Sequence, residues 1–505
     1  MSRTEPWRPQ WHFSAHRNWI NDPNGLIWLD GPSGGEYHLF FQYNPNGSQW
    51  GHMSWGHAVS TDLLNWQELP VAIPEDERTS IFSGSVVLDR HNTSGFGRDG
   101  VAPLVACYTG CLRRSEGGQA QELSYSTDRG RTWTPYEGNP VLDLGLRDFR
   151  DPKVFWHAPT ARWVMVVVLP DDRRARFYAS SNLKQWTWLS DFDAPFDGQG
   201  IWECPDLIPL PAPDGSTVWL FKVDVFAGHP SGDAGARIFF GQFDGTRFVA
   251  EPEAAPRWAD WGADFYAALS WADVPVVDGQ PRALWLAWQN CHRVAKHLPT
   301  DPFRGAMSVP RELSVVREGG REGGREGERW VLRQQPVREL RALRGQPRSL
   351  ADVAVGGGLV DLQALLPTDS DPRLLDVELT LHDLPADGVV SLLLRHGPGA
   401  GMRVGVDAAR RTVFVDRSQA GFAPPGDALW PQRRHAPEAF TPGAPLKLRV
   451  LLDWASVEVF VGEGEACLSE QILPSDAHQG LALQAEQGSA RCDITVWPLR
   501  AARFS

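Results

Sequence analysis

The sequence lacks any long apolar segment. Its longest uninterrupted apolar run covers residues 163–169, far short of the ~18 to 20 residues that a membrane-spanning helix needs. The opening residues, MSRTEPWRPQW, also lack the apolar core of a secretory signal. We therefore expect a soluble, cytoplasmic protein that has no membrane partner.

Positive charge and cysteine are also scarce. Lys and Arg total 49 against 62 Asp and Glu, which gives a formal net charge of −13. Because phosphate binding depends on clustered cations, no nucleic-acid partner is expected. The six cysteines are scattered through the chain, without disulfide-framework density or zinc-site spacing, so we expect free thiols. The oligomeric state is left open.

Helical periodicity is nearly absent from the first two thirds of the chain. Short runs rich in β-branched and aromatic residues alternate there with Gly, Pro, Asn and Asp, which predicts an all-β architecture. Strands are predicted at 37–43, 85–88, 163–169 and 284–288.

A repeated turn motif sharpens this prediction. It occurs as AVSTDLLNW (58–66), SYSTDRGRTW (124–133), YASSNLKQW (178–186) and GQFDGTRF (241–248). The terminal aromatics are 67, 53 and 62 residues apart, close to one four-stranded sheet with its loops per repeat. The pattern predicts a β-propeller with a central channel. On the repeats alone, chance hairpins in a sandwich remain the alternative.

The second half of the chain has a different pattern. The glycine-rich, charged stretch REGGREGGREGE (317–328) predicts a mobile hairpin tip, and RELRALRGQPRSL (338–350) a short helical connector. Longer alternating runs follow, at 389–395, 402–406, 412–416, 446–452, 456–461 and 494–499, and they predict a two-sheet sandwich. The predicted domains are a propeller at 1–337, a linker at 338–350 and a β-sandwich at 351–505. We expect no catalytic acid in the sandwich.

Three acidic side chains have similar and distinctive neighbours. Asp22 lies in WINDPNG (19–25), Asp151 in FRDPKVFW (149–156) and Glu203 in WECPDL (202–207), each close to a proline and to apolar residues. A buried carboxylate at a strand end is costly unless it is hydrogen-bonded or used in catalysis. By itself, NDPNG is also an ordinary turn signature, so both readings stay open at this point.

With these motifs the chain resembles glycoside hydrolase family 32, the invertase, inulinase, levanase and fructan exohydrolase group. Further motifs follow in the family's order: FFQYNP (40–45), WGHAVSTDLLNW (55–66), FSGS (82–85), DFYAA (264–268), MSVPREL (307–313) and LDWASVEVF (452–460). The resemblance implies a five-bladed β-propeller with its active site at the channel mouth, followed by a C-terminal β-sandwich.

The resemblance also implies the chemistry. Asp22 would be the nucleophile, Glu203 the general acid/base and Asp151 the transition-state stabiliser of a retaining, exo-acting β-fructofuranosidase. Such an enzyme releases terminal fructosyl residues from sucrose, fructooligosaccharides, inulin or levan. It needs no cofactor, because carboxylates supply both acid/base and covalent catalysis. Retention requires the two reacting carboxyl groups to lie ~5 to 5.5 Å apart. We expect the neighbouring anions to raise the pKa of Glu203.

The family pattern further implies a set of substrate-binding residues. The set comprises Asn21, Gln42, Trp50, Phe82, Ser83, Arg150, Asp264 and Trp288. Arg150 is expected to keep Asp151 ionised, with a surface ion pair as the alternative. For Phe82 the alternative is core packing. Trp66 belongs to the repeated turn and is interpreted as a blade fastener, that is, a residue that stabilises its own blade. Cys204 is interpreted either as a small packing residue or as part of the surroundings of the general acid.

One segment departs from the family. In WQNCHRV (288–294), His292 stands where many relatives have a second tryptophan, which leaves the leaving-group subsite open. Either His292 donates to a sugar hydroxyl or it is a polar rim residue. Two other functions also stay open: a fructosyltransferase that uses the same intermediate, and an inactive fructan-binding propeller, which would be expected to have lost one of the acids.

Overall fold

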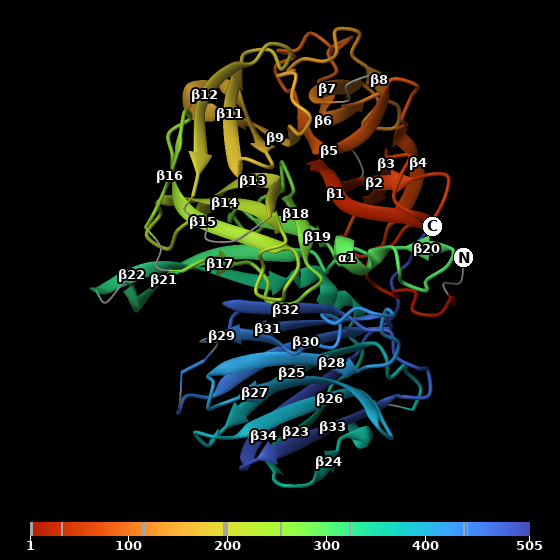
Figure 1. The fold of residues 1–505 in the computed structure, drawn as a ribbon, viewed down its shortest axis with the longest axis vertical. Helices are drawn as coiled ribbons and strands as arrows, with labels where there is room; N and C mark the ends of the chain where they lie inside the picture. The colour runs from red at the N-terminus through yellow and green to blue at the C-terminus, as the bar shows by residue number, and fades with distance from the viewer. Residues whose placement is uncertain are drawn as a thin grey trace.

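The computed structural model describes residues 4–31, 34–113, 118–194, 200–252, 255–322, 325–366, 368–437, 440–441 and 443–505. It consists of two stacked β bodies (Figure 1), with the N-terminal body drawn in red to green and the C-terminal body in green to blue. No helix in these ranges is long and apolar enough to cross a membrane.

The N-terminal body contains five sheets. The first joins β1 (Asn18–Leu29), β2 (Glu36–Asn44), β3 (Ser54–Ser60), β4 (Gln67–Ile73) and the parallel β20 (Phe303–Arg304). The second joins β5 (Thr79–Leu88), β6 (Leu104–Leu112), β7 (Gln119–Ser126) and β8 (Thr134–Pro135). The third joins β9 (Arg150–His157), β10 (Arg162–Leu169), β11 (Arg174–Ser180) and β12 (Thr187–Asp193), with η1 (Ala158–Thr160) between its first two strands.

The remaining two sheets complete this body. The fourth joins β13 (Ile201–Pro211), β14 (Thr217–Phe226), β15 (Gly235–Phe243), β16 (Phe248–Ala250) and β17 (Arg257–Trp258). The fifth joins β18 (Tyr266–Ser270), β19 (Ala283–Trp288), β21 (Arg311–Glu322) and β22 (Arg325–Pro336), with α1 (His292–Ala295) after β19.

The five sheets form a closed ring around a central axis. Their first strands contact one another in the order β1, β5, β9, β13, β18, and β18 returns to β1. Aromatic and branched side chains pack between neighbouring sheets in separate apolar clusters, which include Phe40 and Val86 between the first two blades. The body is therefore a five-bladed β-propeller, as predicted.

The repeated motif forms the same turn in three blades. The indole N–H of Trp66 donates to the carbonyl of Leu63 at 3.2 Å, and Trp133 and Trp186 make the equivalent bond at 3.1 and 2.9 Å. In the turn residues before them, Asp or Asn oxygens accept backbone N–H groups, which explains why these residue types recur there. The interpretation of Trp66 as a blade fastener agrees with this geometry.

The C-terminal body is a sandwich of two six-stranded sheets. One has the order β23 (Arg348–Val355), β34 (Ala490–Pro498), β25 (Leu375–His382), β30 (Leu446–Asp453), β31 (Ser456–Val461), β32 (Ala466–Gln471). The other has the order β24 (Leu359–Asp361), β33 (Gly480–Gln487), β26 (Val389–Gly397), β27 (Ala400–Asp407), β28 (Thr412–Gln419), β29 (Arg434–Pro437), with η3 (Gln363–Leu365) after β24. Alternate side chains of both sheets fill one apolar core.

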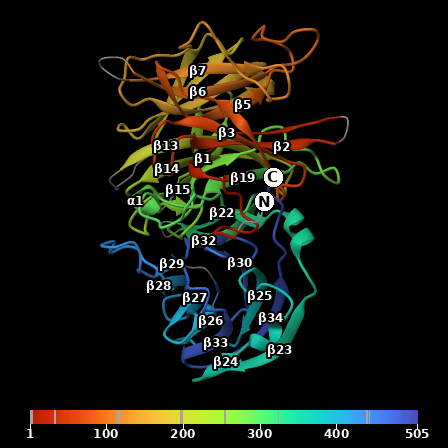
Figure 2. The same ribbon diagram turned by 90° about the vertical axis from the view of Figure 1, so that its right-hand side faces the viewer.

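The two bodies are connected at both ends of the sandwich. The 3-10 helix η2 (Arg338–Leu343) leads from the propeller into β23, which begins inside the stretch predicted as linker. At the other end the chain returns to the propeller, beside which Figure 2 marks the C-terminus. Phe504 there forms a bridge with Trp66. The predicted hairpin exists as β21 and β22, but its tip, 323–324, lies outside the described residues, so its mobility stays a prediction.

Candidate active site

All five inner strands are irregular near the same end of the channel. Strand pairing is interrupted at 20–23 in β1, 81–84 in β5, 150–153 in β9, 203–206 in β13 and 266–269 in β18. Such bulges redirect side chains and are frequent beside active sites. Asp151 and Cys204 adopt positive φ angles of 67° and 47°, which side-chain-bearing residues rarely do. The irregular backbone therefore turns strand-end side chains into the channel.

These side chains surround one cavity of about 330 Å³. It is lined by Asn21, Asp22, Gln42, Trp50, Phe82, Ser83, Gln119, Asp148, Arg150, Asp151, Glu203 and His292. The three acids, which are widely separated in sequence, thus meet at one site. Trp50 is 54% exposed and its ring lies 6.0 Å from that of Phe82 in an edge contact, so the two aromatics form a wall that reaches the surface.

Asp22 is held by short hydrogen bonds. Its Oδ2 accepts from the Ser83 hydroxyl at 2.6 Å, and its Oδ1 accepts from the Asn21 amide at 3.1 Å. The Asn21 oxygen in turn accepts from the indole N–H of Trp19 at 2.7 Å. Bonds of this kind fix the position of the carboxylate, as a nucleophile requires.

Asp151 is anchored through its backbone and one carboxyl oxygen. Its N–H donates to the Thr109 hydroxyl at 2.9 Å, and its Oδ2 accepts the Cys204 N–H at 2.9 Å. The Cys204 thiol lies between the acids, with Sγ 3.5 Å from Asp22 Oδ2 and 3.6 Å from Asp151 Oδ2. Cys204 is therefore a small side chain that packs between two carboxylates. It is both a packing residue and part of the surroundings of the catalytic acids.

Glu203 is bound by a cation and a phenol. Arg150 donates to Oε1 from Nε at 3.1 Å, with Nη2 at 3.0 Å, and the Tyr266 hydroxyl donates to Oε2. Arg150 also donates to Asp148 at 2.8 Å, whereas its Nε is 4.0 Å from Asp151. The guanidinium thus links Glu203 to the cavity wall and makes only a long contact with Asp151.

The charges shift the two acids in opposite directions. Burial raises the pKa of Asp151 to about 7, the anions Glu203 and Asp22 add to this rise, and Arg150 opposes it. Burial also acts to raise the pKa of Glu203, but Arg150, His292 and the Tyr266 hydrogen bond outweigh it, so the pKa of Glu203 is lowered. This differs from our expectation of a raised Glu203 pKa, because Arg150 pairs with Glu203 more closely than with its sequence neighbour.

Two predicted residues do not line the cavity. Asp264 is fully buried, and its Oδ2 accepts from Arg417 at 2.6 Å and from the Gln471 N–H at 2.8 Å, both in the sandwich. Trp288 is also fully buried and packs 6.0 Å from Trp19, so it supports the cavity from behind. The placement of Asp264 corrects the expectation that it belongs to the sugar pocket.

Sequence reasoning missed three residues of the site. Gln119 and Asp148 line the cavity, and Tyr266 binds Glu203. Tyr266 belongs to the same DFYAA motif as Asp264, so the right segment was found but the wrong side chain chosen. His292 does reach the cavity, and its ring packs against those of Tyr266 and Trp288 at 5.4 and 5.1 Å.

Clustered carboxylates around a sugar-sized cavity at the mouth of a propeller channel are the features of a glycoside hydrolase. Comparison with known families agrees. Residues 12–324 match the model for the glycosyl hydrolases family 32 N-terminal domain, and residues 339–498 match that for its C-terminal domain. The chain belongs to glycoside hydrolase family 32 and is an enzyme of the β-fructosidase type.

Individual relatives support this assignment. A levanase of Bacillus subtilis is 42% identical over 98% of this chain and 71% of its own length. An extracellular exo-inulinase of Aspergillus awamori is 35% identical over 93% of this chain and 90% of its own. The crystal structure of exo-inulinase from A. awamori superposes with a TM-score of 0.88 at 33% identity, covering 99% of this chain and all of the other. The expected propeller and sandwich are thereby confirmed.

A further relative has been solved with a bound sugar. The β-fructofuranosidase of Schwanniomyces occidentalis, in complex with fructosyl-erythritol, superposes with a TM-score of 0.87 at 27% identity over 99% of both chains.

Proposed function

We propose that this protein is a retaining, exo-acting β-fructofuranosidase that removes terminal fructosyl units from fructans and sucrose. The observation that carries this proposal is the meeting of Asp22, Asp151 and Glu203 around one cavity, each held by its own hydrogen bonds.

In the first step, Asp22 attacks the anomeric carbon of the fructosyl unit. Glu203 gives its proton to the glycosidic oxygen, so the bond to the leaving sugar breaks and a fructosyl ester forms on Asp22. In the second step, Glu203 takes a proton from water, which attacks the anomeric carbon, breaks its bond to the Asp22 oxygen and regenerates the Asp22 carboxylate. Asp151 accepts hydrogen bonds from fructosyl hydroxyls and stabilises the positive charge that develops on the ring.

The pKa order in the unliganded site gives this cycle a proton source. Asp151 and Glu203 interact, so their pKa values belong to the pair. Burial raises the pKa of Asp151 to about 7, whereas Arg150 lowers that of Glu203, so protonation favours Asp151 over Glu203 in the unliganded site. Sugar hydroxyls that donate to Asp151 favour its ionised form, and the proton then passes to Glu203, where the first step needs it.

The cavity's size and lining support exo action. A volume of about 330 Å³ is at the small end of ligand sites and suits one terminal fructosyl unit with part of its leaving group. Within the described residues, Gln42 Nε2 is buried without a hydrogen-bond partner. A sugar hydroxyl would satisfy this donor, which supports the assignment of Gln42 to substrate binding.

A parallel product profile on sucrose, inulin and levan tests the proposal. Chromatography should show free fructose from the first minutes, before any short fructooligosaccharides appear from inulin or levan. A ladder of oligosaccharides from these polymers would contradict exo action. Predominant fructooligosaccharides at high sucrose, with little free fructose, would instead identify a fructosyltransferase.

A further inference from the structure

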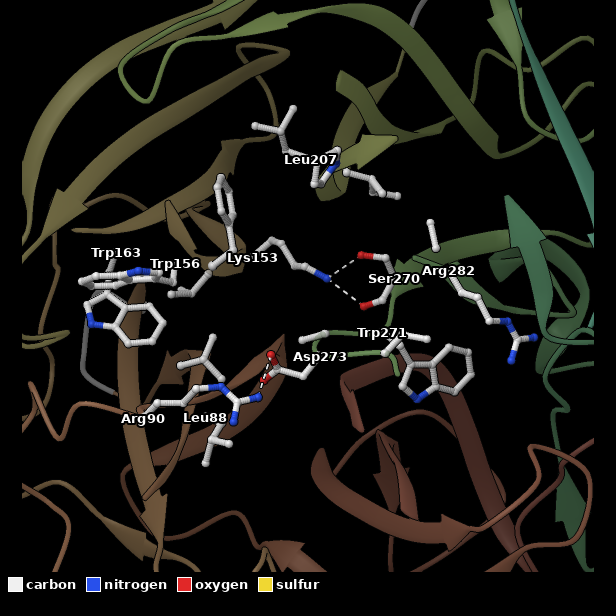
Figure 3. Close-up of a pocket in the computed structure, with 18 of the residues that line it drawn as sticks. Leu88, Arg90, Lys153, Trp156, Trp163, Leu207, Ser270, Trp271, Asp273 and Arg282 are labelled. Carbon is white, nitrogen blue, oxygen red and sulfur yellow. Dashed lines mark hydrogen bonds and ion pairs between the residues drawn. The ribbon is translucent and has the colours of Figure 1, made fainter. Parts of the chain in front are cut away.

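A second cavity, of about 480 Å³, lies at the opposite end of the inner strands. On β9 the catalytic cavity is lined at Asp151 and the second cavity at 153–156, and on β13 the corresponding positions are Glu203 and 207–209. The second cavity begins two residues beyond Asp151 on β9 and four beyond Glu203 on β13 and extends on to Trp156 and Pro209, so the two cavities lie toward opposite ends of the inner strands. Figure 3 shows the second cavity with its lining side chains.

Buried ion pairs lie beside the strand segments that separate the two cavities. Lys153 Nζ donates to Asp206 at 3.3 Å and to the carbonyl and hydroxyl oxygens of Ser270 at 2.8 and 2.9 Å. Nearer the catalytic mouth, Lys222 Nζ donates to Asp224 at 2.5 Å and to the Cys204 carbonyl at 2.6 Å. The two cavities share no lining residue, so the second cavity is a separate site.

The walls of the second cavity are aromatic. Four indoles line it: Trp156, Trp163, Trp219 and Trp271. The rings of Trp156 and Trp163 meet at 5.1 Å and 70°, so they form two faces of a corner. The N–H groups of Trp163 and Trp271 donate to Thr93 and to the His38 carbonyl, which fixes these two rings in place. Rigid indole faces match the C–H faces of sugar rings.

The cavity also carries polar groups suited to hydroxyls. Arg90 and Asp273 pair at 3.1 Å on the rim, and both are partly exposed, so each has hydrogen-bonding capacity left for a ligand. The Ser270 hydroxyl and Lys153 lie on the floor (Figure 3). The guanidinium of Arg282 is engaged by Glu312 and Glu339 and presents mainly its stem. Fixed aromatic faces with a few convergent polar groups are typical of a ligand site.

We propose that this second cavity is a non-catalytic binding site for a sugar unit of a fructan chain. The choice of fructan as ligand rests on the proposed function. A site at the opposite end of the inner strands keeps the enzyme attached to a polymer while other chain ends enter the catalytic cavity, which raises their effective concentration. The second site does not affect the hydrolysis of sucrose, because sucrose has no further chain end that this site could bind.

Native gels that contain inulin test this binding. The parent is Asp22→Asn, which leaves the polymer intact, and Trp156→Ala is added to it. Loss of one stacking face should weaken the apparent affinity about tenfold. Trp188→Ala is the matched control, because Trp188 belongs to the same blade, is 57% exposed and lies outside both cavities. Equal retardation of the Trp156→Ala and Trp188→Ala proteins would overturn the proposal.

A second variant covers the case in which Trp156→Ala fails to fold. Asp273→Ala changes only the partly exposed rim, and it should weaken retardation severalfold with an unchanged Tm. Unchanged retardation with a folded Asp273→Ala protein would count against the site. In crystals of Asp22→Asn soaked with a short inulin oligosaccharide, we expect a sugar ring on Trp156. Density in the catalytic cavity alone would overturn the proposal.

Kinetics separate this inference from the proposed function. In the active enzyme, Trp156→Ala should raise KM for inulin severalfold and leave kcat/KM for sucrose within about twofold. If the unaltered enzyme hydrolyses sucrose and inulin but Trp156→Ala changes neither, only the second site is refuted. If the unaltered enzyme releases no fructose from any of these substrates, the proposed function itself fails.

Discussion

Two buried charge clusters contain the same residue types but have different roles. At the catalytic mouth, Arg150 pairs with Glu203 and Asp148, whereas Asp151 lies 4.0 Å from it and Asp22 lines the same cavity, with His292 nearby. Between the propeller and the sandwich, Arg311 binds Asp260 and Glu458 at 3.0 and 2.7 Å, and Arg417 binds Asp264 and Glu470 at 2.6 and 2.9 Å. The interface has a close cation for each of these acids, whereas the catalytic mouth has excess negative charge.

The difference lies in charge compensation and not in the pKa directions, because burial also raises the pKa of Asp260 and of Glu470 at the interface. The pKa of Glu458 is lowered because Arg311 and His12 outweigh burial, so that carboxylate is fixed as an anion. At the catalytic mouth burial and neighbouring anions raise the pKa of Asp151 to about 7, which leaves a proton that can move. Substitutions in the first cluster should therefore change chemistry, and substitutions in the second should change stability.

The largest effect is expected from the two reacting acids. Asp22→Ala and Glu203→Ala should each lower kcat at least ~10⁴-fold. The Tm should stay unchanged or rise slightly, because one of several like charges is removed. Sucrose hydrolysis and calorimetry measure the two quantities, and Asp30→Asn, at the exposed end of the same strand region, is the control. Retention of a tenth of wild-type kcat in either variant would remove the assignment.

Breaking the interface cluster should cost stability instead. Arg311→Met leaves Asp260 and Glu458 buried without their cation, which should destabilise the fold by ~3 to 5 kcal/mol. Thermal unfolding measures this, while kcat of the protein that remains folded should be unchanged. Arg338→Met is the matched control, since its partner Glu312 is near the surface and exposed ion pairs contribute only ~0 to 1 kcal/mol. Similar Tm values for the two variants would contradict the comparison.

A smaller, pH-dependent effect is expected at Tyr266. Its hydroxyl stabilises the Glu203 anion, so Tyr266→Phe should raise the pKa of Glu203. Because the first step needs protonated Glu203, the alkaline limb of kcat/KM against pH should move to higher pH. Activity at the optimum should fall about tenfold or less. An alkaline limb that stays in place, or moves to lower pH, would show that Tyr266 does not set the Glu203 pKa.

The smallest effect concerns His12 at the interface. Burial acts to lower its pKa, but Asp453 and Glu458, both 2.9 Å from its ring nitrogens, raise it above the usual 6.5. A raised pKa means that the stabilisation is complete below about pH 6.5 and is lost as the pH rises through the folded-state value. The Tm difference between wild type and His12→Asn should therefore shrink as pH rises above 6.5. A Tm difference that grows with pH would contradict a raised pKa of His12.

The sequence predicted the catalytic half of this comparison better than the interface half. The propeller and the sandwich follow from local signals, namely the repeated turn and the alternating runs, and the roles of the three acids follow from the family resemblance of their motifs. The role of Asp264 could not follow from them, because its partner Arg417 is 153 residues away and on the other body. The pairing of Arg150 with Glu203 could not be predicted either, because the adjacency of Arg150 to Asp151 in the sequence suggested Asp151 as its partner. Gln119 reaches the cavity from β7 without any sequence signal.

Peptide mapping of a trapped intermediate tests the central claim most directly. The Glu203→Gln variant is incubated with an activated fructosyl substrate whose leaving group needs no proton, quenched in acid and analysed by mass spectrometry. The account predicts that the peptide containing Asp22 becomes heavier by one fructosyl unit, because the second step lacks its base. A fructosyl unit on the peptide with Asp151, or release of fructose with inverted configuration and no label, would contradict it.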